Sequence, residues 1–173
     1  MTQKKICMLG SFSVGKTSLV SRFVSSVFSE KYLTTVGVKI DKKVVTVEGV
    51  ETTLLLWDIY GEDDFQKMRM SYLRGAGGYL LVVDGTRRAT LDVALGIQRA
   101  VAEQIGPIPF VVCLNKSDLK PEWEIDLDLL HERGRAGNWL VLETSAKLGT
   151  GVEDAFHHLT SRMLAVESTT SPS

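Results

Sequence analysis

Cysteine is scarce in this sequence, and neither sign of charge is in clear excess. The two cysteines among 173 residues, Cys7 and Cys113, both lie inside apolar runs without a nearby partner cysteine or histidine. This placement excludes a disulfide framework and favours two reduced, buried thiols, which is typical of a reducing compartment. Twenty basic residues against 21 acidic ones give a net charge of −1. No overall field therefore attracts nucleic acid or an anionic membrane.

Long hydrophobic runs and lipidation signals are also missing. The apolar run that follows the first five residues is too short for a signal peptide or a membrane span. Residue 2 is Thr2 rather than glycine, and the final residues are rich in serine and threonine and contain no cysteine. Neither myristoylation nor prenylation is therefore expected. We expect a cytoplasmic protein with no direct lipid anchor.

The composition fits one globular domain. The chain is 44% hydrophobic and 24% charged, close to the average for soluble proteins, and is long enough for one core. We expect this domain over residues 1–166 and a disordered polar tail over residues 167–173. His131, His157 and His158 do not form a metal-binding set, because two adjacent histidines on a helix cannot face one ligand.

Strand-like apolar runs alternate with amphipathic segments along the chain. We expect strands over residues 6–9, 38–47, 52–58, 79–84, 110–115 and 139–143. We expect helices over residues 17–27, 91–104, 127–135 and 152–166. The alternation predicts βαβ units, and a hairpin turn over residues 47–50 adds one antiparallel edge strand. The expected fold class is α/β, with a mixed, mostly parallel six-stranded sheet and helices on both faces.

Residues 10–17 match the phosphate-binding pattern G-x-x-x-x-G-K-[ST]. The glycines let the backbone turn so that several N–H groups point at a phosphate. Lys16 supplies a positive charge to the β- and γ-phosphates. Thr17 offers a hydroxyl to Mg²⁺ at the start of a helix, whose N-terminus favours an anion. The loop lies between an expected strand and an expected helix, which favours this interpretation over an ordinary glycine-rich turn.

A second motif ends an apolar strand. Leu54, Leu55, Leu56 and Trp57 lead into Asp58, and Gly61 follows three residues later. Beside a phosphate-binding loop, an aspartate at the end of a strand is placed to organise Mg²⁺. Glycine has no side chain, so its N–H can approach a γ-phosphate closely. An aspartate in such a position is common by itself, and the loop upstream is what favours the metal-binding role.

A third motif indicates which base is bound. Asn115, Lys116, Ser117 and Asp118 follow an apolar strand and read N-K-x-D. The aspartate of this pattern can accept hydrogen bonds from the N1–H and the N2 amino group of guanine. Adenine lacks this arrangement of donors, so it would leave a buried charge unpaired. The segment 144–147, with the sequence T-S-A-K, follows the last strand and is expected to close the other side of the base.

Together, these motifs resemble those of small GTPases of the Ras superfamily, in order and in spacing, over residues 4–166. Within it the chain is most similar to the Rab branch. Residues 35–38, T-V-G-V, resemble the Rab switch I sequence, and residues 72–76, Y-L-R-G-A, resemble its Y-Y-R-G-A. The segment between Lys120 and Trp139 has no room for the extra helix of the Rho branch, and there is no acidic tail like that of Ran. The fold implied is the G domain of P-loop NTPases.

The resemblance implies roles for individual residues. Phe28 stacks on the guanine, Tyr32 lies over the phosphates, and Thr35 joins Thr17 and Asp58 in binding Mg²⁺. Residues 29–38 and 58–72 correspond to switches I and II, which the γ-phosphate holds and hydrolysis releases. Through them a monomeric protein contacts effectors and regulators. The residues expected to contact GTP or GDP are Ser13, Val14, Gly15, Lys16, Thr17, Ser18, Phe28, Tyr32, Thr35, Gly61, Asn115, Lys116, Asp118, Leu119, Ser145, Ala146 and Lys147.

Three residues near the γ-phosphate depart from the family pattern. The family usually has D-T-A-G-Q-E in switch II, whereas residues 58–63 read D-I-Y-G-E-D. Glu62 therefore replaces the glutamine that orients water, and an ionised carboxylate can accept but not donate a hydrogen bond. Tyr60 and Phe12 replace small residues, and Phe12 crowds the approach of an arginine finger. The expected catalytic residues are Lys16, Gly61 and Glu62, and hydrolysis is expected to be slow.

Three functions remain open on the sequence. The first is a molecular switch that binds GTP or GDP with Mg²⁺ and hydrolyses GTP slowly. The second is a GTP-binding interaction module whose hydrolysis is negligible because of Glu62, Tyr60 and Phe12. The third is a P-loop kinase or ATPase, in which the N-K-x-D and T-S-A-K segments have no purpose. Single-turnover hydrolysis separates the first two, and the identity of the bound nucleotide tests the third.

Overall fold

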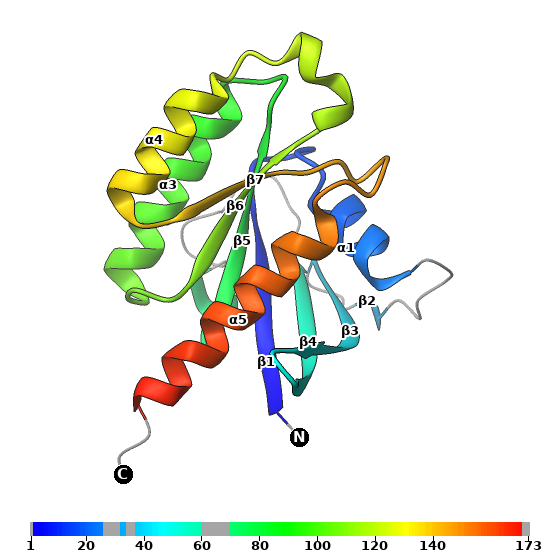
Figure 1. Cartoon of the computed structure of the whole chain (residues 1–173), viewed down its shortest axis with the longest axis vertical. Helices are drawn as coiled ribbons and strands as arrows, with labels where there is room; N and C mark the ends of the chain where they lie inside the picture. The colour runs from blue at the N-terminus through cyan, green and yellow to red at the C-terminus, as the bar shows by residue number, and fades with distance from the viewer. Residues whose placement is uncertain (1, 26–31, 34–36, 60–69, 171–173) are drawn as a thin grey trace.

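The computed structural model describes residues 2–25, 32–33, 37–59 and 70–170, and Figure 1 shows how they are arranged. One sheet runs through the molecule in the order β2-β3-β4-β1-β5-β6-β7. The strands are β1 (Thr2–Gly10), β2 (Tyr32–Leu33), β3 (Val38–Val47), β4 (Val50–Ile59), β5 (Gly78–Asp84), β6 (Phe110–Asn115) and β7 (Leu140–Glu143). The helices are α1 (Lys16–Val24), α3 (Ala89–Gln104), α4 (Leu127–Gly137) and α5 (Val152–Thr170), with a 3₁₀ helix η1 (Ser117–Glu122).

The sheet is mixed and mostly parallel, as the sequence predicts. Strands β4, β1, β5, β6 and β7 are parallel to one another, and β3 runs antiparallel to β4. The β3–β4 turn has Glu48 at φ 52° and Gly49 at φ 78°, the two positive angles that a tight hairpin turn requires. Strand β2 pairs antiparallel with β3 and adds a seventh strand to the six expected. Two residues are too few to show the alternation that predicts a strand.

Helices cover both faces of the sheet and enclose a core on each (Figure 1). On one face α1 and α5 pack together, and the rings of Phe23 and Phe156 stack with their centroids 3.9 Å apart. On the other face, α3 and α4 contribute Ile97 and Leu130 to the second core. Strand β5 is buried on both sides, because its alternate residues enter the two cores in turn. The expected α/β class is confirmed.

Both cysteines are free and buried, as expected. Cys7 lies in the core beneath α3 and α4, and Cys113 lies in the core beneath α1 and α5. Burial raises the pKa of each thiol to about 12, so both stay protonated at neutral pH. They act as small apolar side chains in two separate cores.

The C-terminal helix is longer than the sequence pattern indicates. α5 continues to Thr170, so the prediction of a disordered tail is wrong for residues 167–170. The hydroxyl groups of the last helical turn donate hydrogen bonds to backbone carbonyls within the helix, and Glu167 forms an ion pair with Lys4 of β1. These contacts let polar residues extend the helix.

No helix in the described part of the chain is long and apolar enough to cross a membrane.

Candidate functional site

The three sequence motifs meet at one edge of the sheet. Parallel strands β1, β4, β5, β6 and β7 all end there. The phosphate loop follows β1, Asp58 lies near the end of β4, and Asn115 ends β6. Ligands of open α/β sheets bind at the carboxyl ends of the strands. The topology therefore brings together segments that lie more than a hundred residues apart in the sequence, such as Val14 and Asn115.

The phosphate loop is closed around the side chain of Lys16. Its buried ammonium donates hydrogen bonds to the carbonyls of Gly10, at 2.8 Å, and Ser11, at 3.2 Å. A Cβ on Gly10 would lie 2.4 Å from the carbonyl oxygen of Val82, and one on Gly15 would lie 2.3 Å from Asn115 Nδ2. Both positions therefore require glycine. Because α1 begins directly after Gly15, its first N–H groups point back into the loop, as an anion requires.

Thr17 and Asp58 form the candidate metal site. The Thr17 hydroxyl donates a hydrogen bond of 2.5 Å to Asp58 Oδ2, and Asp58 Oδ1 is buried without a hydrogen-bond partner among the described residues. Burial raises the pKa of Asp58 above its ordinary value, although the Thr17 hydrogen bond and the charges of Lys16 and Lys39 act in the opposite direction. A hydroxyl beside an unsatisfied carboxylate oxygen fits Mg²⁺, which prefers one or two protein oxygens and completes its shell with water and phosphate.

The segment after β6 is tied both to the phosphate loop and to the segment after β7. Asn115 donates from Nδ2 to the Val14 carbonyl at 2.9 Å and accepts at Oδ1 from the Thr144 hydroxyl at 3.1 Å. The buried Ser145 donates from its hydroxyl to Asp118 Oδ1 at 2.7 Å and accepts from the Leu148 N–H at 3.0 Å. The Ser145 hydroxyl thus fixes one carboxylate oxygen of Asp118.

Asp84, at the end of β5, joins the site although sequence reasoning did not single it out. Its buried carboxylate pairs with Lys116 at 2.7 Å and with Arg87 at 3.0 Å, and accepts from the N–H and hydroxyl of Thr86. Burial alone would raise the pKa of Asp84, but the hydrogen bonds from Lys116, Thr86 and Arg87 lower it to about 2. The sequence did contain a signal for Asp84. Like Asp58, it is an aspartate at the end of an apolar strand.

The two cations bound to Asp84 reach the phosphate loop. Lys116 donates to the Ser13 carbonyl at 3.3 Å, and Arg87 donates to the Phe12 carbonyl at 2.8 Å. The Phe12 side chain itself is 64% exposed at the outer corner of the loop. A single buried carboxylate therefore fixes two residues that hold adjacent carbonyls of the loop.

The structure describes only part of the predicted site. Val14 is buried in the core, so it contributes its backbone to the loop, whereas Ser18, Leu119 and Lys147 are exposed nearby. Ala146 is half-buried, and its carbonyl accepts a hydrogen bond from Arg22. The predictions for Phe28, Thr35, Tyr60, Gly61, Glu62 and most of both switches fall outside the described residues, as does that for the side chain of Tyr32.

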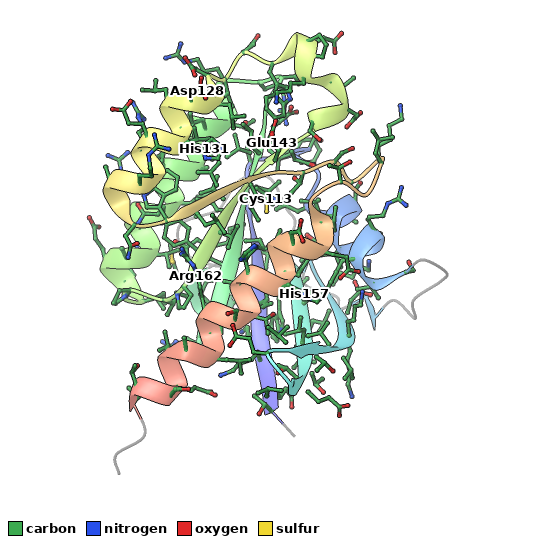
Figure 2. The ribbon with its side chains drawn as sticks, in the orientation of Figure 1. Cys113, Asp128, His131, Glu143, His157 and Arg162 are labelled. Carbon is green, nitrogen blue, oxygen red and sulfur yellow. The ribbon has the colours of Figure 1, made fainter. Side chains whose placement is uncertain are left out.

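The histidines and Glu143 belong to none of the motifs. Figure 2 places His131 on α4 and His157 on α5, on opposite faces of the sheet, and His157 Nε2 lies 3.4 Å from Glu153 of its own helix. Glu143, at the end of β7, forms an ion pair with Lys120 of η1. The described ranges contain no group of three or more histidine, cysteine or acidic residues arranged to hold a metal.

Comparison with known proteins identifies the family. The sequence model described as "Ras family" matches residues 5–165. The chain is 31% identical to Ras-related protein RabJ of Dictyostelium discoideum over 163 residues, which cover 94% of this chain and 64% of RabJ. It is 35% identical to human Ras-related protein Rab-4B and 32% identical to the GTP-binding protein YPT1 of Saccharomyces cerevisiae, each over 153 residues. These 153 residues cover 88% of this chain, 72% of Rab-4B and 74% of YPT1. The chain thus spans less than two thirds of RabJ. It belongs to the Ras family and is a Rab-like small GTPase.

Proposed function

We propose that this protein is a molecular switch that binds GTP and GDP with Mg²⁺ and hydrolyses GTP slowly. The observation that carries this proposal is the position of Asn115. Its side chain joins the phosphate loop, through Val14, to the T-S-A-K segment, through Thr144. A phosphate-binding segment and a base-reading segment are thereby held in one fixed relation, which a nucleotide spanning both requires.

Each part of the site has a task in this function. The loop N–H groups and the Lys16 ammonium bind the phosphates, and Asp118 accepts from guanine while Ser145 keeps its carboxylate in place. Thr17, Asp58 and, in the GTP state, Thr35 would hold Mg²⁺, which neutralises charge on the β- and γ-phosphates when bound. Because Asp118 needs two donors from the base, ATP is rejected.

Slow hydrolysis follows from the residues around the γ-phosphate. Glu62 brings a negative charge toward an anion and cannot donate a hydrogen bond to the transferring oxygens. Phe12 lies exposed at the corner of the loop, and we propose that it crowds the path of an arginine finger, which is worth about 10³–10⁵ in rate. The same residues support the second candidate function, an interaction module with negligible hydrolysis.

We propose that partners bind through switch I, residues 29–38, and switch II, residues 58–72. Trp57 of β4 directly precedes switch II in the sequence, and its ring is half-buried. Lys5 Nζ of the neighbouring strand β1 lies 3.7 Å from the centroid of this ring, and the centroid of the Tyr72 ring lies 6.3 Å from it. This surface fits a protein effector or regulator rather than nucleic acid. The proposal includes a monomeric, cytoplasmic protein.

Single-turnover hydrolysis of bound GTP tests the catalytic part of the proposal. We expect a rate on the order of 10⁻³ s⁻¹ or slower without a partner. If Glu62 hinders the reaction, Glu62→Gln accelerates it; if Glu62 is instead the general base, the same change slows it at neutral pH. The matched control is Glu103→Gln, an exposed residue of α3. A wild-type rate above about 0.1 s⁻¹ contradicts slow hydrolysis, and no detectable turnover favours the interaction module.

A further inference from the structure

A buried lysine lies beside the candidate metal site. Lys39 of β3 is 4% exposed and pairs with Asp41, which is 1% exposed, at 3.0 Å. In the β3–β4 register Lys39 lies directly opposite Asp58. Residues directly opposite in an antiparallel pair project from the same face, with Cβ atoms about 5 Å apart. The ammonium-bearing side chain thus emerges next to the carboxylate expected to organise Mg²⁺.

The burial of this lysine calls for a physical reason. Lysine is almost never fully buried unless its charge is paired, and Asp41 supplies that pairing. The pair is not a strong source of stability, because apolar residues of similar volume often replace a buried ion pair without loss. Lys39 Nζ also has no well-aligned hydrogen-bond acceptor within the described part of the chain. Among the described residues, the burial of this charge therefore costs free energy without an evident gain in stability.

The charge acts on Asp58. Lys39 and Asp58 project from the same face of the sheet as direct neighbours, so the ammonium offsets part of the Asp58 charge. Asp41 lies opposite Leu56, one step further from the site along the same face. Lys39 is thus the nearer member of the pair to Asp58.

We propose that Lys39 is a built-in cation of the metal site that makes nucleotide binding less dependent on Mg²⁺. Its ammonium supplies Asp58 with part of the positive charge that the ion otherwise brings, and it repels the ion itself. Without Mg²⁺ it reduces the repulsion between Asp58 and the phosphates, so nucleotide is retained longer. This inference rests on the proposed function, because it concerns how the same site holds GDP.

The test is the release of a fluorescent GDP analogue from the wild type and from Lys39→Met, followed with excess Mg²⁺ and with EDTA. The quantity compared between variants is the EDTA acceleration, which is the release rate with EDTA divided by the release rate with excess Mg²⁺. Coulomb's law at an effective dielectric constant of about 20 makes a nearby unit charge worth about one to two orders of magnitude in binding, of which Asp41 cancels part. We expect this ratio to rise about tenfold in Lys39→Met.

The concentration of free Mg²⁺ that half-protects the complex should fall by a similar factor. The control is Lys42→Met, the same substitution on the same strand at an exposed position. It should leave the ratio at the wild-type value, because its side chain is in water.

Two further variants separate this electrostatic role from a structural one. Asp41→Asn leaves the Lys39 charge uncompensated, so we expect the EDTA acceleration to fall below the wild-type value. Lys39→Arg keeps the charge and should keep the wild-type ratio. Simple loosening of the site would instead speed release in both media and move Lys39→Met and Asp41→Asn in the same direction.

An unchanged ratio in Lys39→Met, or a shift of the same sign in Lys39→Met and Asp41→Asn, overturns the inference. If Lys39→Met does not fold, Asp41→Asn decides alone, and a ratio at or above the wild-type value overturns it. Should the wild type retain no GDP analogue even with Mg²⁺, the proposed function fails together with this inference. If the wild type retains GDP and the ratio is unchanged in the variants, the role of Lys39 is refuted, whereas the proposed function is not.

Discussion

Asp84 offers the sharpest test of how the site is held together. Its buried carboxylate pairs with Lys116 and Arg87, which in turn hold the carbonyls of Ser13 and Phe12. Asp84→Asn keeps the size of the side chain and removes its charge. The variant should therefore lose two charge-assisted hydrogen bonds while the rest of the core stays packed.

The expected magnitude follows from the pKa of Asp84. The gap between the ordinary aspartate pKa of 3.8 and about 2 corresponds to about 2.5 kcal/mol. Lys116 and Arg87 are partly exposed, and solvent screening reduces the figure, so we expect a loss of about 2 kcal/mol in the free energy of unfolding. Because the folded-state pKa is lowered, this stability is present above about pH 4 and is lost as the pH falls toward 2.

Urea unfolding of the wild type and Asp84→Asn at neutral pH and at about pH 3 measures this contribution. The difference between the two proteins should shrink at the lower pH, where wild-type Asp84 begins to lose its advantage. GDP release should also be faster in the variant, since the phosphate loop loses two supports. Glu132→Gln, an exposed change on α4, is the control. Equal stability of the variant and the wild type at neutral pH would refute the reasoning.

Three further predictions concern the nucleotide. Asp118→Asn should weaken GDP binding by more than about 1.4 kcal/mol, or tenfold, and should allow xanthosine diphosphate to bind, as titration calorimetry would show. Gly15→Ala should abolish GDP binding, because its Cβ would lie 2.3 Å from Asn115 Nδ2; retained affinity would contradict this. In a complex with Mg²⁺ and a GTP analogue, Thr17 and Thr35 should both ligate the ion, and a crystal structure with Thr35 turned to solvent would disprove it.

Most of the fold could be predicted because hydrophobic periodicity and motif order agree. The strand over residues 110–115 is observed with the expected bounds, since it is apolar throughout and ends in a polar motif. The two-residue β2 and the last turn of α5 could not be predicted in the same way. The first is too short to show a pattern, and the second depends on backbone hydrogen bonds from Ser168, Thr169 and Thr170 and an ion pair with the distant Lys4.

The candidate site could be predicted where residues belong to a contiguous motif, and not where they act through the fold. The structure brings Lys16, Thr17, Asp58 and Asn115 together, as their motifs indicate. The alternation of apolar Val38 and Ile40 with charged Lys39 and Asp41 favours a solvent-facing charged side. The structure buries that side against α1 instead. Long-range pairing decides such positions, and one sequence does not reveal it.

The central claim is that the site holds a guanine nucleotide. Denaturing the purified protein and identifying the nucleotide it releases, with GDP and ADP binding compared in the presence of Mg²⁺, tests this claim most directly. The arrangement of Asp118, Ser145 and Asn115 around the phosphate loop predicts GDP or GTP in the released fraction and binding of GDP but not ADP. Release of an adenine nucleotide, or equal binding of GDP and ADP, would contradict the claim.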